Sequence, residues 1–277
     1  MDVKQILKES GFRFNKQFGQ NFLTDELLLT QIAQDAKCCD TVLEIGAGAG
    51  TLTRVLSKHA QKVVAFEIDR NLEKVLKITL ADCPNVNLVI GDVMKYKMAE
   101  LESLCGGKYS VVANIPYYIT TPLLMNFIEQ GQNVVSLTLT IQKEVAERLV
   151  ANPSTKQYGA ITVAVDAVAD VEITRVLPRQ LFYPQPNVDS AVVKIVLNRE
   201  KYRIADAKTF RKTVKTAFAM RRKTLANNLA VGFGMDKATA EKILAECGLS
   251  VNCRGEELST QQFVQLAERL NGQDQTK

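Results

Sequence analysis

The stretch that most constrains the fold is residues 42–53, which read Val-Leu-Glu-Ile-Gly-Ala-Gly-Ala-Gly-Thr-Leu-Thr. An apolar run that only Glu44 interrupts meets three glycines at alternate positions, and a helix-compatible segment follows. This pattern predicts a buried strand, a tight turn and the start of a helix. Glycines in such a turn allow positive φ and let a ligand approach the backbone closely. The spacing Gly-x-Gly-x-Gly differs from the dinucleotide fingerprint and from a Walker loop.

Polar side chains follow the next three predicted strands. Glu67 comes directly after the strand at 62–66 and Asn114 directly after 109–113, and Asp92 follows the strand at 86–90 with Gly91 between them. Ligands of open α/β sheets bind at the carboxyl ends of the strands, where an acid can hold ribose hydroxyls. Asp92 is placed to accept a hydrogen bond from an adenine amino group. The strand ends therefore predict a nucleoside pocket that is formed by Gly46, Gly48, Glu67, Asp92 and Asn114.

Alternating strands and helices predict a mostly parallel sheet covered by helices. Further strands are expected at 134–141, 171–177 and 191–197, and helices at 70–82, 98–104, 120–130, 142–151 and 158–168. From residue 203 the chain reads as helical, at 207–219, 222–231, 236–246 and 259–270. We therefore expect an α/β domain over residues 1–200 and a small all-helical domain over residues 201–277.

The N-terminal twenty residues carry four basic and three phenylalanine side chains, and we expect a mobile arm there. Thr24 is expected to cap the helix that follows. The apolar face of that helix is expected to carry Leu27, Leu28 and Ile32.

Charge is distributed unevenly along the chain. Residues 199–223 contain ten Lys or Arg and two acids, whereas the whole chain has a net charge of +5. Arg211 and Lys215 lie four apart on one helix face. Arg221, Arg222 and Lys223 lie at a helix junction. Such a block indicates a polyanionic partner, although a solvated helix face would give the same pattern.

A loop with two prolines spans residues 182–190. The prolines make it stiff and extended. Phe182 precedes them and offers a ring on which a base could stack, provided that it is exposed. The alternative is that Phe182 packs against the edge of the sheet.

Several classes of protein are disfavoured. His59 is the only histidine and no Cys-x-x-Cys pair occurs, so we expect no metal site. No apolar run is long enough to span a bilayer, and the N-terminus lacks the apolar segment of a secretory signal. We therefore expect a cytoplasmic protein without membrane contact, and we take a monomer as the default.

Asn114-Ile115-Pro116-Tyr117, together with the glycine turn, Glu67 and Asp92, resembles S-adenosylmethionine-dependent class I methyltransferases. Over nearly the whole chain the sequence is similar to ribosomal RNA small subunit adenine N6-dimethyltransferases of the KsgA type. The resemblance implies a Rossmann-like methyltransferase domain that uses S-adenosyl-L-methionine and a basic RNA-binding domain that carries Arg221 to Leu225. It also implies that residues 17–23 close over the cofactor, which Asn21 and Leu23 contact.

The Asn-Ile-Pro-Tyr segment suits methylation of an adenine amine. That amine is a poor nucleophile because its lone pair is delocalised into the ring. The Asn114 side-chain oxygen and the Ile115 carbonyl can hold its hydrogens. Pro116 has no N–H to compete, and Tyr117 offers a stacking face. The expected catalytic residues are therefore Asn114, Ile115, Pro116, Tyr117 and Phe182.

The resemblance implies dimethylation of two adjacent adenosines near the 3′ end of 16S rRNA in the small ribosomal subunit. A macrolide-resistance methyltransferase that acts on 23S rRNA is the nearest alternative, because Ile115 stands where the dimethylating family more often has Leu. The Arg221–Leu225 segment favours the small subunit. A third possibility is an RNA-binding ribosome assembly factor that retains the fold without the activity, which intact Asn114 and Tyr117 disfavour.

Overall fold

The computed structural model describes residues 3–12, 14, 19–23, 25–36, 39–115 and 119–271. The chain divides into two compact units: residues 1–146 with 172–197, and residues 147–171 with 198–277. This division groups residues 147–171 with the C-terminal helices, whereas the expected boundary lay at residue 200.

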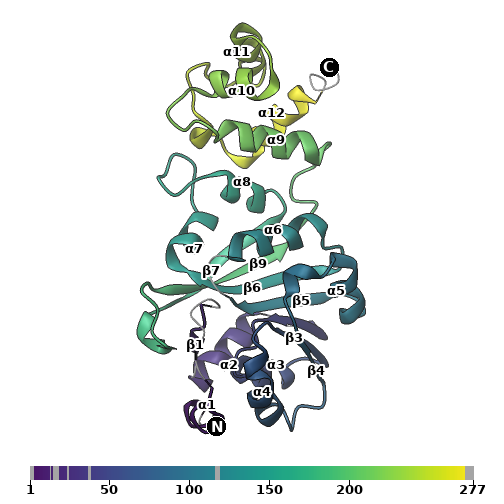
Figure 1. The fold of residues 1–277 in the computed structure, drawn as a ribbon. Helices are drawn as coiled ribbons and strands as arrows, with labels where there is room; N and C mark the ends of the chain where they lie inside the picture. Colours follow the sequence, from purple (N-terminus) through teal and green to yellow (C-terminus); the bar gives the residue numbers. More distant parts are fainter. Residues whose placement is uncertain are drawn as a thin grey trace. The chain divides into compact units, whose positions relative to one another are not determined.

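The first unit is built on a sheet that has seven strands within the described residues (Figure 1). Its strands, in spatial order, are β4 (Val86–Ile90), β3 (Lys62–Glu67), β2 (Thr41–Ile45), β5 (Tyr109–Asn114), β6 (Val134–Gln142), β9 (Ser190–Leu197) and β7 (Ala169–Leu177). The pairings from β4 to β6 are parallel, and β9 runs antiparallel to β6. The strand order reverses at β2, which is where open α/β sheets bind ligands.

Helices follow the strands as expected, with small differences at their ends. They are α2 (Glu26–Asp35), α3 (Thr51–Ser57), α4 (Glu73–Thr79), α5 (Met98–Cys105), α6 (Thr120–Gln130) and α7 (Lys143–Leu149). Figure 1 shows α2, α3 and α4 on one side of the strands and α5 and α6 on the other. The helix expected at 70–82 is divided into the 3-10 helix η2 (Arg70–Leu72) and α4, and a second 3-10 helix, η3 (Val93–Lys95), follows β4.

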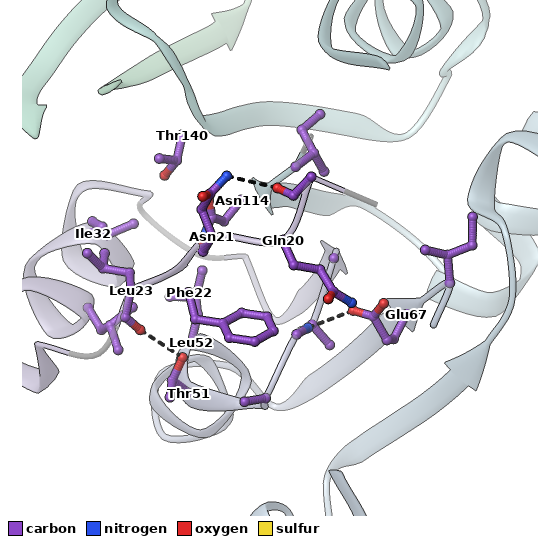
Figure 2. Close-up of a pocket in the computed structure, with 18 residues that line it drawn as sticks. Gln20, Asn21, Phe22, Leu23, Ile32, Thr51, Leu52, Glu67, Asn114 and Thr140 are labelled. Atoms are coloured by element: carbon purple, nitrogen blue, oxygen red, sulfur yellow. Dashed lines mark hydrogen bonds between the residues drawn. The ribbon is translucent and has the colours of Figure 1, made fainter. Parts of the chain in front are cut away.

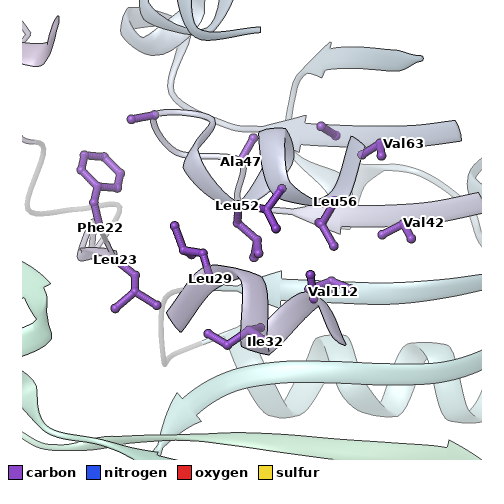
Figure 3. Packing of buried hydrophobic residues seen from close by; sticks show 14 of the residues in the cluster. Phe22, Leu23, Leu29, Ile32, Val42, Ala47, Leu52, Leu56, Val63 and Val112 are labelled. Carbon is purple, nitrogen blue, oxygen red and sulfur yellow. The ribbon is translucent and has the colours of Figure 1, made fainter. Parts of the chain in front are cut away.

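The core of the first unit lies where α2 and α3 meet the sheet (Figure 3). Of the expected apolar face of α2, Leu28 packs against this core and Ile32 is buried, whereas Leu27 is 71% exposed; Leu29 is buried as well. The cap of α2 is Asp25, which accepts from the Leu28 amide at 3.0 Å. The expectation placed it one residue too early, at Thr24, which lies outside the described residues.

The N-terminal region has more structure than a mobile arm. Helix α1 spans Val3–Glu9, and Phe12 and Phe14 pack against the core of the first unit. Strand β1 (Phe22–Leu23) then pairs antiparallel with β8 (Phe182–Tyr183), which follows the 3-10 helix η5 (Arg179–Leu181). This pairing joins segments about 160 residues apart, which no local pattern reveals. The mobility expected of the arm stays a prediction.

The second unit is helical. It consists of α8 (Ala160–Asp166), α9 (Ala207–Ala217), α10 (Leu225–Phe233), α11 (Lys237–Glu246) and α12 (Thr260–Leu270), with the 3-10 helix η6 (Gly255–Glu257). Tyr158 explains why residues 147–171 belong here, because its hydroxyl donates to the Leu258 carbonyl at 2.7 Å and its ring contacts Phe218. Its neighbour Val163 is buried in the same hydrophobic cluster.

Candidate active site

The glycine turn after β2 lies against the ends of two neighbouring strands. The amides of Gly46 and Ala47 both donate to the Phe66 carbonyl of β3 at 2.9 Å. Gly46 has φ +83°, and a Cβ there would lie 2.9 Å from the Asn114 carbonyl oxygen. Any other residue at position 46 would therefore force the turn away from the end of β5.

Glu67 is anchored beneath this turn. Its side chain is 5% exposed, and its two oxygens accept from the amides of Gly48 at 2.7 Å and Asp69 at 2.8 Å. Burial raises the pKa of Glu67, and the two backbone hydrogen bonds oppose that rise because they favour the carboxylate. The acid that the sequence places at the end of β3 is thus fixed in orientation at the glycine turn.

A pocket lies at the carboxyl ends of β2, β3, β5 and β6 (Figure 2). It brings together seven residues that the sequence analysis selected, namely Asn21, Leu23, Gly46, Gly48, Glu67, Asn114 and Ile115. Leu52, Ile68 and Ile32 add apolar surface to its wall. Its enclosed volume is about 70 Å³.

Residues 19–23 form one wall of the pocket, and hydrogen bonds to Asp69, Thr51 and Asn114 help to hold them, in addition to the pairing of β1 with β8. The Gln20 amide donates to Asp69 Oδ2 at 2.8 Å, and the Thr51 hydroxyl donates to the Leu23 carbonyl at 3.2 Å. Asn114 Nδ2 donates to the Asn21 carbonyl at 3.3 Å (Figure 2). This last bond orients the Asn114 amide, so that its Oδ1 is the atom that remains to accept a hydrogen from a ligand.

Two expected site residues lie outside the pocket lining. Asp92 caps η3, where its Oδ1 accepts from the Met94 amide at 3.0 Å. Phe182 is 5% exposed and packs in the core of the first unit, which agrees with the packed alternative rather than with an exposed ring. The reason is the pairing of β8 with β1, which places Phe182 opposite Leu23, while the neighbouring Tyr183 is 46% exposed. Pro116 and Tyr117 lie outside the described residues.

The pocket also contains residues that the sequence analysis missed. Thr140 lies near the end of β6, so the rule that selected the other strand ends would have found it had it been applied to one more strand. Gln20 and Phe22 carry no comparable signal. They reach the pocket because β1 pairs with β8, and a Cβ on Gly48 would lie 2.9 Å from the Phe22 ring.

The basic residues selected from the sequence lie in the second unit. Arg211 and Lys215 are exposed on α9, opposite its buried face. Arg221, Arg222 and Lys223 are exposed in the turn that leads to α10, and Arg221 pairs with Glu256 at 3.0 Å. The turn itself is fixed by Thr224, which caps α10, and by Leu225, which is fully buried.

Two kinds of site are absent from the described residues. They contain no cluster of His, Cys, Asp or Glu suited to holding a metal ion. Nor do they contain a helix that is both long and apolar enough to cross a bilayer.

Known proteins resemble this chain in sequence and in fold. The sequence profile of the family described as ribosomal RNA adenine dimethylase matches residues 11–272. Ribosomal RNA small subunit methyltransferase A of Clostridioides difficile (strain 630) is 44% identical over 275 residues, which cover 97% of this chain and 95% of the relative. The protein of the same name from Lactococcus lactis subsp. lactis (strain IL1403) is 42% identical, with 97% and 94% covered.

Two solved structures resemble the chain throughout. A dimethyladenosine transferase from Plasmodium falciparum has a TM-score of 0.78 at 25% identity, with 91% of this chain and 98% of that one covered. The 23S rRNA methyltransferase ErmE has a TM-score of 0.70 at 26% identity, with 91% and 100% covered. The sheet order, the helices and these likenesses show a Rossmann-like α/β methyltransferase fold. From the match to the family profile and from these near full-length relatives, we conclude that the chain belongs to the ribosomal RNA adenine dimethylase family.

Proposed function

We propose that this chain transfers methyl groups from S-adenosyl-L-methionine to the N6 amines of two adjacent adenosines near the 3′ end of 16S rRNA in the small ribosomal subunit. The product would be N6-dimethyladenosine. The observation that carries this proposal is the position of Asn114, whose amide is oriented at the mouth of a pocket that also contains Glu67 and the glycine turn. The name shared by the relatives from Clostridioides difficile and Lactococcus lactis supports the small subunit as the target.

The residues of the pocket fit the proposed cofactor chemically. Glu67 offers carboxylate oxygens to ribose hydroxyls. Gly46 and Gly48 let the turn pack closely against Asn114 and Phe22, because a Cβ at either position would clash with them. The apolar wall suits an adenine ring. When bound, this cofactor supplies a methyl group activated by the positive charge of its sulfonium. We propose Asn21, Leu23, Gly46, Gly48, Glu67, Asp92 and Asn114 as its contacts, with Asp92 the least supported because it lies outside the lining.

The closed part of the pocket is smaller than a nucleoside requires. Its volume of about 70 Å³ compares with roughly 300 Å³ or more for common small-molecule sites. Residues 19–23 form one of its walls. We therefore propose that this segment moves outward when the cofactor enters and closes over it afterwards, which is the role that the family resemblance implies.

The acceptor side of the site performs positioning rather than acid–base chemistry. Asn114 Oδ1 and the Ile115 carbonyl would accept the two N6 hydrogens and turn the lone pair toward the methyl group. The amine then loses a proton, which water can take. We keep Pro116 and Tyr117 in the proposal on sequence grounds. Phe182 could act as a stacking surface only if the β1–β8 pair opened, because its ring is buried in the closed arrangement.

The basic residues of the second unit are the proposed RNA contacts. Arg222 and Lys223 are exposed at the start of α10, and Arg211 and Lys215 are exposed on α9, where they can approach phosphates. Arg221 is held by Glu256, so we assign it a smaller share in binding. The ribosomal substrate also supports a cytoplasmic location, and we propose a monomer as the active form.

Mapping the methylated nucleotide tests the proposal. Purified 30S particles that lack the modification and purified 50S particles are each incubated with the protein and labelled cofactor. We expect two dimethylated adenosines near the 3′ end of 16S rRNA and no label in 50S particles. Label confined to 23S rRNA would instead support the macrolide-resistance type of activity, which the likeness to ErmE keeps as the alternative. Binding to 30S particles without any methyl transfer would support a non-enzymatic assembly factor.

A further inference from the structure

Glu44 is a buried acid that the proposed mechanism does not use. It lies in β2, two residues before Gly46, and is 1% exposed. Among the described residues, neither of its carboxyl oxygens has a hydrogen-bond partner. The hydroxyl of Thr53 on α3 is also fully buried and without a partner. Buried polar groups are rarely left unsatisfied, so two of them beside a ligand-binding turn call for an explanation.

The strand register places Glu44 beside the pocket acid. Glu44 pairs with Ala65 of the neighbouring strand, and Glu67 follows Ala65 by two residues. Because side chains alternate along a strand, Glu67 and Glu44 lie on the same face of the sheet. Glu67 lines the pocket and is held by two amides, whereas Glu44 lies deeper on the adjacent strand with no such support.

The surroundings of Glu44 favour its neutral form. Burial raises the pKa of Glu44 to about 8; the nearby Thr53 hydroxyl opposes the rise without reaching hydrogen-bond geometry, and the negative charge of Glu67 adds to it. Among the described residues, Glu67 is the ionisable group whose charge acts on Glu44, and Glu67 is itself influenced by Asp69. No basic side chain of those residues acts on it. A positive charge on a ligand in the pocket would therefore stabilise the carboxylate form of Glu44.

We propose that Glu44 is a proton-linked positioning residue, which holds a proton while the pocket contains no sulfonium and releases it to solvent when a sulfonium binds. This inference rests on the proposed cofactor. Only the O–H bond of the Glu44 carboxyl breaks in this step: the proton goes to solvent, and the charge of the bound sulfonium compensates for the carboxylate that remains. Once the methyl group has left, the remaining thioether is neutral and Glu44 takes up a proton again. Glu44 thereby favours the methyl donor over its spent product.

The two cofactor forms provide a matched pair of probes. S-adenosylmethionine and S-adenosylhomocysteine share the adenosine, the α-amino group and the carboxylate, and they differ in the methyl group and its positive charge. Proton changes that arise from the shared groups cancel when the two ligands are compared. Calorimetric titration in two buffers with different ionisation enthalpies counts the protons that each ligand releases.

We expect S-adenosylmethionine to release up to one proton more than S-adenosylhomocysteine. The ratio of their association constants should then rise by up to tenfold per pH unit between about pH 6.5 and 7.5. Equal proton counts for the two ligands would overturn the inference and leave the proposed function intact. Failure of both ligands to bind would instead overturn the proposed cofactor.

Substitutions identify which acid supplies the proton. E44Q removes the titrating group at nearly constant volume, so the difference between the ligands should vanish while both still bind. E129Q, at an exposed position on α6, should leave the difference unchanged. A difference that persists in E44Q would assign the proton to another group and contradict the inference. Should E44Q not fold, T53V serves instead, because loss of its hydroxyl should move the pH midpoint upward only if Glu44 is the source.

Discussion

The pocket edge of the first unit and the basic turn of the second hold their functional residues in opposite ways. Glu67 and Asn114 come from separate strands and are fixed by hydrogen bonds to backbone groups at the pocket. Arg222 and Lys223 are instead exposed, and only the turn beneath them is fixed, by Leu225. In an enclosed site the residues position one ligand together, so the loss of any one of them disturbs the whole site. Exposed cations instead make separate contributions to RNA affinity, and salt screens them.

The largest effect is expected at Asn114. N114A should lower methyl transfer by about 10²- to 10³-fold, because an oriented acceptor for the N6 hydrogens is lost. Cofactor affinity, measured separately by calorimetry, should fall much less. Transfer at the wild-type rate would show that Asn114 has no role in orienting the amine. The pocket would then be no more sensitive to a single substitution than the exposed basic turn is.

The second effect compares two acids at neighbouring strand ends. E67Q should weaken cofactor binding by roughly 10- to 100-fold, because a charged acceptor with two backbone donors is replaced by a neutral amide. D92N should change affinity by less than about threefold, because Asp92 caps η3 outside the pocket lining. A larger loss for D92N than for E67Q would show that the pocket extends to β4 when the cofactor is bound.

The two units should also respond to pH in opposite directions. The pKa of Glu44 is raised to about 8, so its proton is retained in the folded state and lost on unfolding above the ordinary value of 4.5. Stability of the first unit should therefore fall by up to about 1.4 kcal/mol per pH unit as the pH rises from about 4.5 to 8.

The acids of the second unit give the opposite sign. Thr209 and Thr239 donate hydrogen bonds that lower the pKa values of Asp206 and Asp236, which cap α9 and α11. Their stabilisation is present above the ordinary Asp value and is lost as the pH falls through the lowered one. Hydrogen exchange followed across pH, corrected for intrinsic rates, measures each unit separately; parallel trends would contradict this comparison.

The smallest effect is expected from single basic residues. R222A and K223A should each weaken binding to small-subunit RNA by a few-fold, and each should reduce the slope of log K against log salt by about 1. K74A, at an exposed position on α4, removes the same charge from the first unit and should leave the slope unchanged. An equal reduction for K74A would mean that RNA binding reflects net charge rather than a defined surface.

Much of the first unit could be predicted because its signals are local. Alternating apolar runs and glycines located the strands and the turn at 46–50, and the rule of strand ends selected Glu67 and Asn114. The helices of the second unit were also located to within a few residues. Helix ends were less accurate, as at Thr24, because neighbouring polar residues can both act as caps.

What the sequence alone determined is the set of elements and the edge of the sheet at which polar residues gather, since backbone propensity and side-chain alternation act over a few residues. Only the tertiary structure decided which of those residues share a cavity. Pairing between β1 and β8 buried Phe182 and brought Gln20 and Phe22 to the pocket, and the turn after β4 left Asp92 outside the pocket lining. Such contacts depend on the closure of long loops, and their energy is not encoded in any short stretch of the chain.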